Sequence, residues 1–214
     1  MTIPKSKILA WLRASAAVLE ENKTYLTDLD SPIGDADHGV NMDRGFKKIL
    51  SQLPTVEDKD IGTILRTAGM ALVSSVGGAG GPLYGTFFME AGKVTAGKTE
   101  LSDEDLLLLL ESGLKGVIRI GKTNLGDKTM VDALHPAVEA LRKALADHVE
   151  TAQALRLMTE AARQGMVDTI PMLARKGRAS YVGERSIGHQ DPGATSSYLI
   201  LKALMETITA DQTG

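Results

Sequence analysis

The chain has 214 residues, 43% of them hydrophobic, and a formal net charge of −3, which favours one domain with a sizeable core. It contains no cysteine, which excludes disulfides, thiolate metal sites, iron–sulfur clusters and cysteine nucleophiles. No lysine- or arginine-rich run is present, so the composition does not point to direct nucleic-acid binding.

The apolar segments are too short for a membrane protein. No apolar run is longer than that from Leu106 to Leu110, which is far below the roughly 20 residues that cross a bilayer. Lys5, Lys7 and Arg13 interrupt the apolar residues near the N-terminus, which does not fit a signal peptide. We therefore expect a cytoplasmic protein without membrane contact.

Apolar residues recur at helical spacing along almost the whole chain, and strand-like alternation is nearly absent. The pattern predicts about eight helices, with short connections that favour antiparallel neighbours. The expected ranges are 4–22, 41–53, 57–76, 83–97, 103–120, 128–147, 151–170 and 193–210.

Several residues indicate where these helices begin or break. Thr55 with Asp58, and Ser102 with Asp105, fit the capping-box pattern. A proline at 192 suits a first helical turn. Pro136 lies inside the expected helix 128–147, where it lacks a donor, so we expect a kink or two separate pieces.

The first informative loop is residues 28–41, where Asp30, Asp35 and Asp37 are separated by a proline and a glycine. Three converging carboxylates repel one another unless a hard cation neutralises them. Magnesium is the natural candidate, with phosphate oxygens completing its ligands. The alternatives are a solvated acidic turn for the aspartates and a structural or exposed role for His38.

The second loop is residues 74–88, in which four of the five residues from Gly77 to Gly81 are glycine and a helix follows. Bare backbone N–H groups at a helix N-terminus bind phosphate without a positive side chain. The alternative is close packing between helices.

The third loop, residues 175–196, is basic and ends at a helix start marked by Asp191, Pro192 and Gly193. It could fold over a ligand as a lid, with its basic side chains paired to phosphate oxygens. The alternative is an exposed charged loop. The basic residues are Arg175, Lys176, Arg178 and Arg185.

Residues 92–99 and 116–123 both match the P-loop pattern G-x-x-x-x-G-K-[ST]. A functional P-loop lies between a strand and a helix, whereas both matches follow helical patterns. We interpret them as helix C-termini with glycine and lysine. A fourth loop, 121–132, has a composition suited to the edge of a nucleotide site.

Four motifs together resemble those of the L subunit of bacterial dihydroxyacetone kinases, and the resemblance covers essentially the whole chain. The motifs are GDADHG, GGAGGPLYGTFF, GDKTM and RKGRASYVGERSIGHQDPGATS. The resemblance implies an all-α fold in which residues 1–214 form one antiparallel eight-helix barrel. It also implies that ADP and two magnesium ions bind in the loops at one end.

The resemblance further implies roles for individual residues. Asp30, Asp35 and Asp37 would be magnesium ligands, and Arg178 is the one candidate for contact with the phosphate in the transition state. Many relatives have a serine where this chain has Gly80, so a hydroxyl contact to phosphate is missing while backbone donors remain. The implied nucleotide contacts are His38, Gly39, Asn41, Ala79, Gly80, Gly121, Met130, Arg178, Asp191, Pro192 and Gly193.

The resemblance implies that the chain is one subunit of a kinase whose activity is divided between separate subunits. Dihydroxyacetone would sit on a separate K subunit, and ADP would be rephosphorylated in place by a phosphohistidine of an M subunit. One alternative is the L subunit of an ATP-dependent kinase for a ketose such as erythrulose, with exchanging nucleotide. Another is a regulatory module that contacts a transcription regulator; a homodimer is a further expected possibility.

Overall fold

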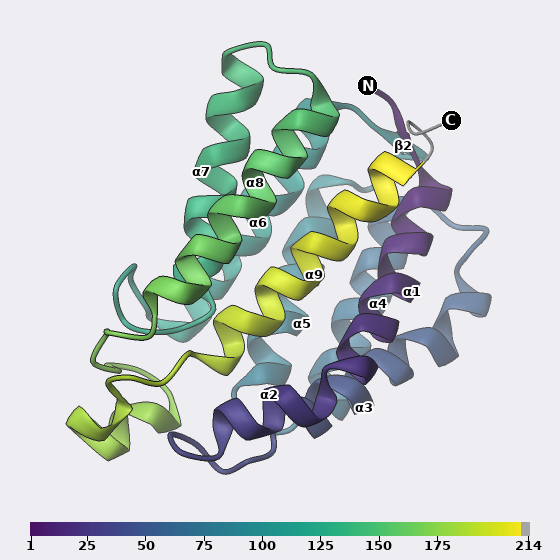
Figure 1. The fold of residues 1–214 in the computed structure, drawn as a ribbon. Coiled ribbons are helices and arrows are strands. Elements are labelled where there is room, and N and C mark those ends of the chain that lie inside the picture. The colour runs from purple at the N-terminus through teal and green to yellow at the C-terminus, as the bar shows by residue number, and fades with distance from the viewer. Residues whose placement is uncertain (211–214) are drawn as a thin grey trace.

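The computed structural model describes residues 1–210, and most of them lie in nine α-helices (Figure 1). The all-helical expectation is confirmed. The α-helices are α1 (Lys5–Glu21), α2 (Lys23–Asp30), α3 (His38–Gln52), α4 (Ile61–Ser75), α5 (Gly80–Val94), α6 (Asp103–Gly121), α7 (Val131–Ala146), α8 (Thr151–Asp168) and α9 (Pro192–Thr209). The remaining elements are the 3-10 helices η1 (Leu53–Thr55) and η2 (Arg178–Ser186) and the strands β1 (Ile3–Pro4) and β2 (Glu100–Leu101).

The eight longer helices form a closed ring, in which each packs against the next: α1, α3, α4, α5, α6, α7, α8, α9 and back to α1. The interior is filled by one large apolar cluster. Within it, the ring centroids of Trp11 and Phe88 are 5.5 Å apart, and the Phe46 ring meets that of Phe88 edge-on at 6.2 Å. The Trp11 Nε1 donates to the Ile200 carbonyl at 2.9 Å, which joins the first and last helices of the ring.

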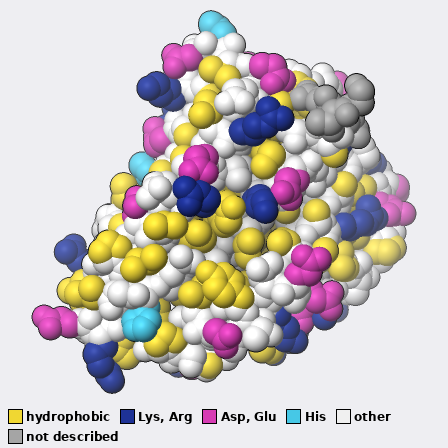
Figure 2. All heavy atoms as spheres, viewed as in Figure 1, with side chains coloured by type: hydrophobic (Ala, Val, Ile, Leu, Met, Phe, Trp, Pro, Cys, Tyr) yellow, Lys and Arg dark blue, Asp and Glu magenta, His cyan; other side chains and the backbone are white. Residues whose placement is uncertain are grey.

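The two ends of the barrel differ. The antiparallel pair β1–β2 lies at the end where the chain begins and where α9 ends (Figure 1). At the opposite end lie α2 and the connections α2–α3, α6–α7 and α8–α9. On the face shown in Figure 2, acidic and basic side chains are interspersed. Among residues 1–210, none of the helices is long and apolar enough to cross a membrane.

The helix α2 was not among the expected elements. It begins directly after α1, which ends where the Asn22 side chain donates to the Val18 carbonyl at 2.8 Å. The helix α3 begins at His38, three residues earlier than expected. Asp30 explains this early start, because its carboxylate accepts the N–H groups of Asp37 and His38 at 3.0 and 3.2 Å.

One of the two predicted capping boxes is confirmed. Ser102 accepts the N–H of Asp105, and Asp105 accepts the N–H of Ser102. The prediction of a helix start at Thr55 with Asp58 is wrong. The helix α4 begins later, at Ile61, because the Asp60 carboxylate accepts the Thr63 N–H at 3.1 Å and caps it instead.

The two prolines behave differently from one another. Pro192 opens α9 as expected. The predicted break at Pro136 is wrong, because α7 continues through it as one helix. A carbon added to Gly165 of α8 would lie 2.1 Å from the Asp132 carbonyl and 2.8 Å from the Pro136 ring. The close approach of α8 therefore supports α7 where proline removes a backbone hydrogen bond.

Candidate nucleotide site

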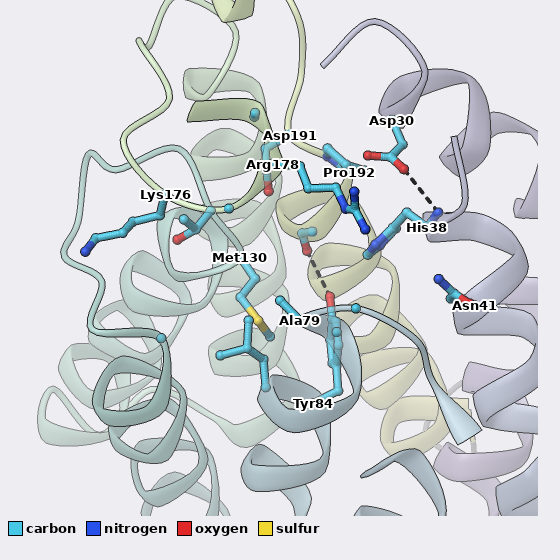
Figure 3. Close-up of a pocket in the computed structure, with 18 of the residues that line it drawn as sticks. Asp30, His38, Asn41, Ala79, Tyr84, Met130, Lys176, Arg178, Asp191 and Pro192 are labelled. Carbon is cyan, nitrogen blue, oxygen red and sulfur yellow. Dashed lines mark hydrogen bonds between the residues drawn. The ribbon is translucent and has the colours of Figure 1, made fainter. Parts of the chain in front are cut away.

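A cavity of about 480 Å³ (Figure 3) opens among the loops at the end of the barrel opposite the β1–β2 pair (Figure 1). Its volume is in the range of small-molecule binding sites. Four chain segments line it: the α2–α3 connection with the start of α3, residues 76–84, the α6–α7 connection, and the α8–α9 segment. The tertiary fold thus brings together the four loops that the sequence singled out.

The first segment supplies an acidic cluster. Asp30, Asp35 and Asp37 each place a carboxylate oxygen within 4.8 Å of the other two. Burial, together with the charges of Asp37 and Asp30, raises the pKa of Asp35, while Arg178 opposes the shift. Burial is the largest cause of this rise, and repulsion from the neighbouring carboxylates adds to it. A nearby positive charge would stabilise these carboxylates, and their oxygens are suitable ligands for a hard cation such as Mg²⁺.

His38 lies on the first turn of α3 and belongs to a hydrogen-bonded network between three helices. Its Nε2 is 2.8 Å from the Ser196 Oγ, which is 2.6 Å from the Tyr84 hydroxyl. The Tyr84 hydroxyl also donates to the Gly193 carbonyl at 3.0 Å. Burial lowers the pKa of His38 despite the neighbouring Asp30 and Asp37. A neutral imidazole in this network fixes side-chain positions rather than adding positive charge.

The second segment forms the glycine-rich start of α5. Ala79 precedes the helix, no side chain caps it, and Gly78 has φ of +62°. Its first N–H groups are consequently available to an anion in the cavity. Arg44 donates to the Asn41 Oδ1 at 2.5 Å and to the Ser75 carbonyl at 2.7 Å. This contact orients the Asn41 amide so that its NH₂ group remains a donor beside the glycines.

An apolar wall faces another part of the cavity. It is formed by residues from the start of α5, the end of α6 and the segment that leads into α7, and it includes Gly121 and Met130. Such a surface suits the flat faces of a nucleobase, which are apolar. Its other members are Pro82, Leu83, Val117 and Ile120.

Both P-loop matches follow helices, as interpreted from the sequence. Gly92 lies in α5, and the loop after it leads to the short strand β2. Gly116 and Gly121 lie in α6, which ends at Lys122 with φ of +47°. The strand–loop–helix context of a P-loop is therefore absent from both matches.

The α8–α9 segment, residues 169–191, reaches the acidic cluster through Arg178, and we call it the lid. The Arg178 guanidinium lies 2.9 Å from an Asp35 carboxylate oxygen. Lys176 also lines the cavity, whereas Arg175 and Arg185 are exposed and are not among the lining residues. Figure 3 shows Arg178, His38 and Ala79 arranged around the same space.

The lid ends at the start of α9. Asp191 is buried, and its carboxylate accepts the Ala194 N–H at 2.7 Å as the N-cap. Burial raises the pKa of Asp191 to about 7. Pro192 and Gly193 follow it in the cavity wall.

Among the nucleotide contacts that the resemblance implies, Gly39 is the one that does not line the cavity. A carbon added there would lie 2.0 Å from the Lys23 carbonyl, so this glycine allows α2 and α3 to pack closely. The sequence reasoning did not assign Lys128 or Tyr84 to the site. Tyr84 lies inside the glycine-rich motif, which was the available signal. Other unassigned lining residues include Ile33, Val76, Leu83, Val117, Ile120, Thr123, Thr129, Gly177 and Ala179.

Comparison with known proteins identifies relatives over most of the chain. A family model described as the DAK2 domain matches residues 32–206. The chain is 48% identical over 204 residues to the "PEP-dependent dihydroxyacetone kinase, ADP-binding subunit DhaL" of Escherichia coli (strain K12), covering 95% of this chain and 97% of that protein. It is 45% identical to the ADP-binding subunit DhaL of PEP-dependent dihydroxyacetone kinase 2 of Listeria innocua, covering 92% of each.

A solved structure is also similar. The dihydroxyacetone kinase from C. freundii in complex with AMP-PNP and Mg²⁺ superposes with a TM-score of 0.70 and 28% sequence identity. The match covers 92% of this chain but 33% of that one. The chain therefore corresponds to about a third of the C. freundii enzyme.

Proposed function

Because the chain belongs to the DAK2 domain family, we propose that it is the ADP-binding subunit of a phosphoenolpyruvate-dependent dihydroxyacetone kinase. The observation that carries the proposal is one cavity that combines an acidic cluster, a bare helix N-terminus and a lid arginine. These three features suit the metal and the phosphate groups of a magnesium nucleotide.

The acidic cluster is the proposed magnesium site. Asp30, Asp35 and Asp37 would hold up to two ions, in keeping with the tendency of Mg²⁺ to use one or two carboxylates and to share phosphate oxygens. When bound, magnesium neutralises the negative charge of the phosphates. The mutual repulsion of the aspartates explains why a cation stabilises this arrangement.

The remaining polar groups would bind and orient the phosphates. The first N–H groups of α5 at Ala79 and Gly80 donate from one side, with the Asn41 amide beside them. Arg178 would approach from the lid, where a guanidinium can form two parallel hydrogen bonds to a phosphate. Catalysis by these residues would consist of positioning and charge stabilisation, so no general base is required on this chain.

The nucleotide would act as a coenzyme. Bound ADP would accept a phosphoryl group from a phosphohistidine of an M subunit and pass it to dihydroxyacetone on a K subunit. The names of the two bacterial relatives, both of PEP-dependent kinases, support this version over an ATP-dependent ketose kinase.

Analysis of the purified chain tests the proposal. The protein is isolated without added nucleotide, denatured, and the released small molecules and metals are identified by chromatography and elemental analysis. Near-stoichiometric ADP with magnesium would support the coenzyme role. A folded protein that is isolated empty and binds ATP on addition would indicate the exchanging kinase, and failure to bind any nucleotide would refute the proposal.

A further inference from the structure

Lys128 is a buried cation that the proposed function does not use. It lies in the α6–α7 connection, residues 122–130, and is 1% exposed. Its backbone has φ of +62°, which is uncommon for a residue with a side chain. The carboxylates of Asp127 and Asp132 accept N–H groups of the same connection and wind it tightly. This path directs the Lys128 side chain into the protein rather than into solvent.

The Lys128 ammonium is surrounded by backbone carbonyl oxygens. Five of them lie between 2.5 and 3.4 Å from Nζ. An ammonium has three protons, so it bonds three oxygens at a time and attracts the others electrostatically. We call this set the carbonyl cage; its members are the carbonyls of Thr169, Ile170, Met172, Ser186 and His189.

The carbonyl cage joins the two ends of the lid. Residues 169–172 directly follow α8, whereas 186–189 lead into α9, and the segment between them carries Arg178. Three weaker links run alongside. The Gly188 N–H donates to the Ile170 carbonyl at 2.8 Å, the Ala174 N–H to the Ser186 Oγ at 3.0 Å, and the Asp191 N–H to the Thr169 Oγ1 at 3.0 Å. The charged contact from Lys128 attaches both ends to the α6–α7 connection.

Removing the ammonium would leave the cage without its cation. Carbonyl oxygens that point at one another repel, and buried acceptors without a donor are costly. The ends of the lid would separate or admit water. Arg178 depends on the path of the same segment to reach Asp35, so its position would be less well defined.

We propose that Lys128 is a positioning residue: by filling the carbonyl cage, it holds both ends of the lid closed and thereby places Arg178 over the acidic cluster. The proposal rests on the proposed function for the consequence at the nucleotide. Its structural part, the anchoring of residues 169–191, does not depend on the ligand.

The test compares Lys128→Met with Lys122→Met, an exposed lysine of the same connection that does not line the cavity. Hydrogen exchange followed by mass spectrometry reports the amides of residues 169–191. Stopped-flow fluorescence measures the rate at which the site releases a fluorescent ADP analogue in the presence of magnesium. We expect Lys128→Met to lose protection in this segment and to release nucleotide about 10-fold faster, a usual effect for groups that orient binding residues. Lys122→Met should behave as the unmodified protein.

Unchanged protection of residues 169–191 in Lys128→Met would overturn the proposal, as would lost protection with an unchanged release rate. If Lys128→Met does not fold, Lys128→Ala with propylammonium restores the missing atoms, and 1-propanol is the uncharged control. If propylammonium but not 1-propanol restores the amide protection of residues 169–191 and slows nucleotide release, the proposal is supported. If neither compound restores them, the proposal is refuted. If the unmodified protein binds no nucleotide, the proposed function fails, while the exchange experiment still decides the anchoring.

Discussion

The guanidinium of Arg178 lies 2.9 Å from the carboxylate of Asp35, and this ion pair connects the lid to the acidic cluster. The Arg178 side chain is 61% exposed and that of Asp35 33%. Exposed pairs of this kind contribute about 0–1 kcal/mol. The pair can therefore open at little cost, which frees both charges for a metal and a phosphate.

The acidic cluster should be essential for metal-dependent binding. Asp35→Ala removes one of three converging carboxylates, and we expect it to abolish Mg²⁺-dependent ADP binding in isothermal titration calorimetry. Asp28→Ala, an exposed aspartate of α2, is the control and should bind normally. Equal affinity in the two variants would remove Asp35 from the site.

The two P-loop matches should be dispensable. Lys98 pairs with Asp105 at 3.0 Å, and Lys122 ends α6 on the surface. Neither residue lines the cavity. We expect Lys98→Ala and Lys122→Ala to change the dissociation constant for ADP by less than about 3-fold, since surface changes rarely exceed ±0.5 kcal/mol. A collapse of binding in either variant would contradict our interpretation.

Alanine substitutions at two glycines can separate the effect of backbone strain on stability from the effect of the glycine-rich loop on ligand binding. Gly78 and Gly97 both have positive φ, at +62° and +75°, and a carbon added to either meets no atom within 4 Å. An alanine at either position should destabilise the protein by about 1 kcal/mol in urea denaturation. Because only Gly78 lines the cavity, Gly78→Ala alone should weaken ADP binding. Equal binding by both variants would argue against the glycine-rich phosphate site.

The observed cap of α4 predicts a pH-dependent contribution to stability. Hydrogen bonds to the Asp60 carboxylate lower its pKa from 3.8 to about 2, and the bond from the Thr63 side chain contributes most. A lowered folded-state pKa stabilises the protein above pH 3.8, and this stabilisation is lost as the pH falls through about 2. Asp60→Ala should therefore cost about 1 kcal/mol at neutral pH, as a lost N-cap does, and progressively less below pH 4.

Urea denaturation of Asp60→Ala between pH 2 and 7 measures this difference. Thr55→Ala is the matched control, because Thr55 is where the sequence pattern wrongly placed the helix start. It should change the free energy of unfolding by less than about 0.5 kcal/mol. A larger effect for Thr55 than for Asp60 would show that the observed cap is not the stabilising one.

The sequence by itself determined the helical class, most helix ranges and the local features of the site. Helical periodicity and the Ser102 capping box depend on residues within one or two turns, so they are visible in the sequence. The same holds for Asp30, Asp35 and Asp37, which one short loop brings together. The glycine-rich start of α5 is likewise a local pattern.

Only the tertiary structure decided which groups meet across the barrel. The carbonyl partners of Lys128 lie 41 to 61 positions further along the chain, and Arg178 reaches Asp35 from the far side of the cavity. Pro136 stays helical because α8 packs against it, and α3 starts early because Asp30 accepts its first N–H groups. Short-range propensities carry no information on such contacts, since these depend on how eight helices close into a ring and bring distant loops to one end.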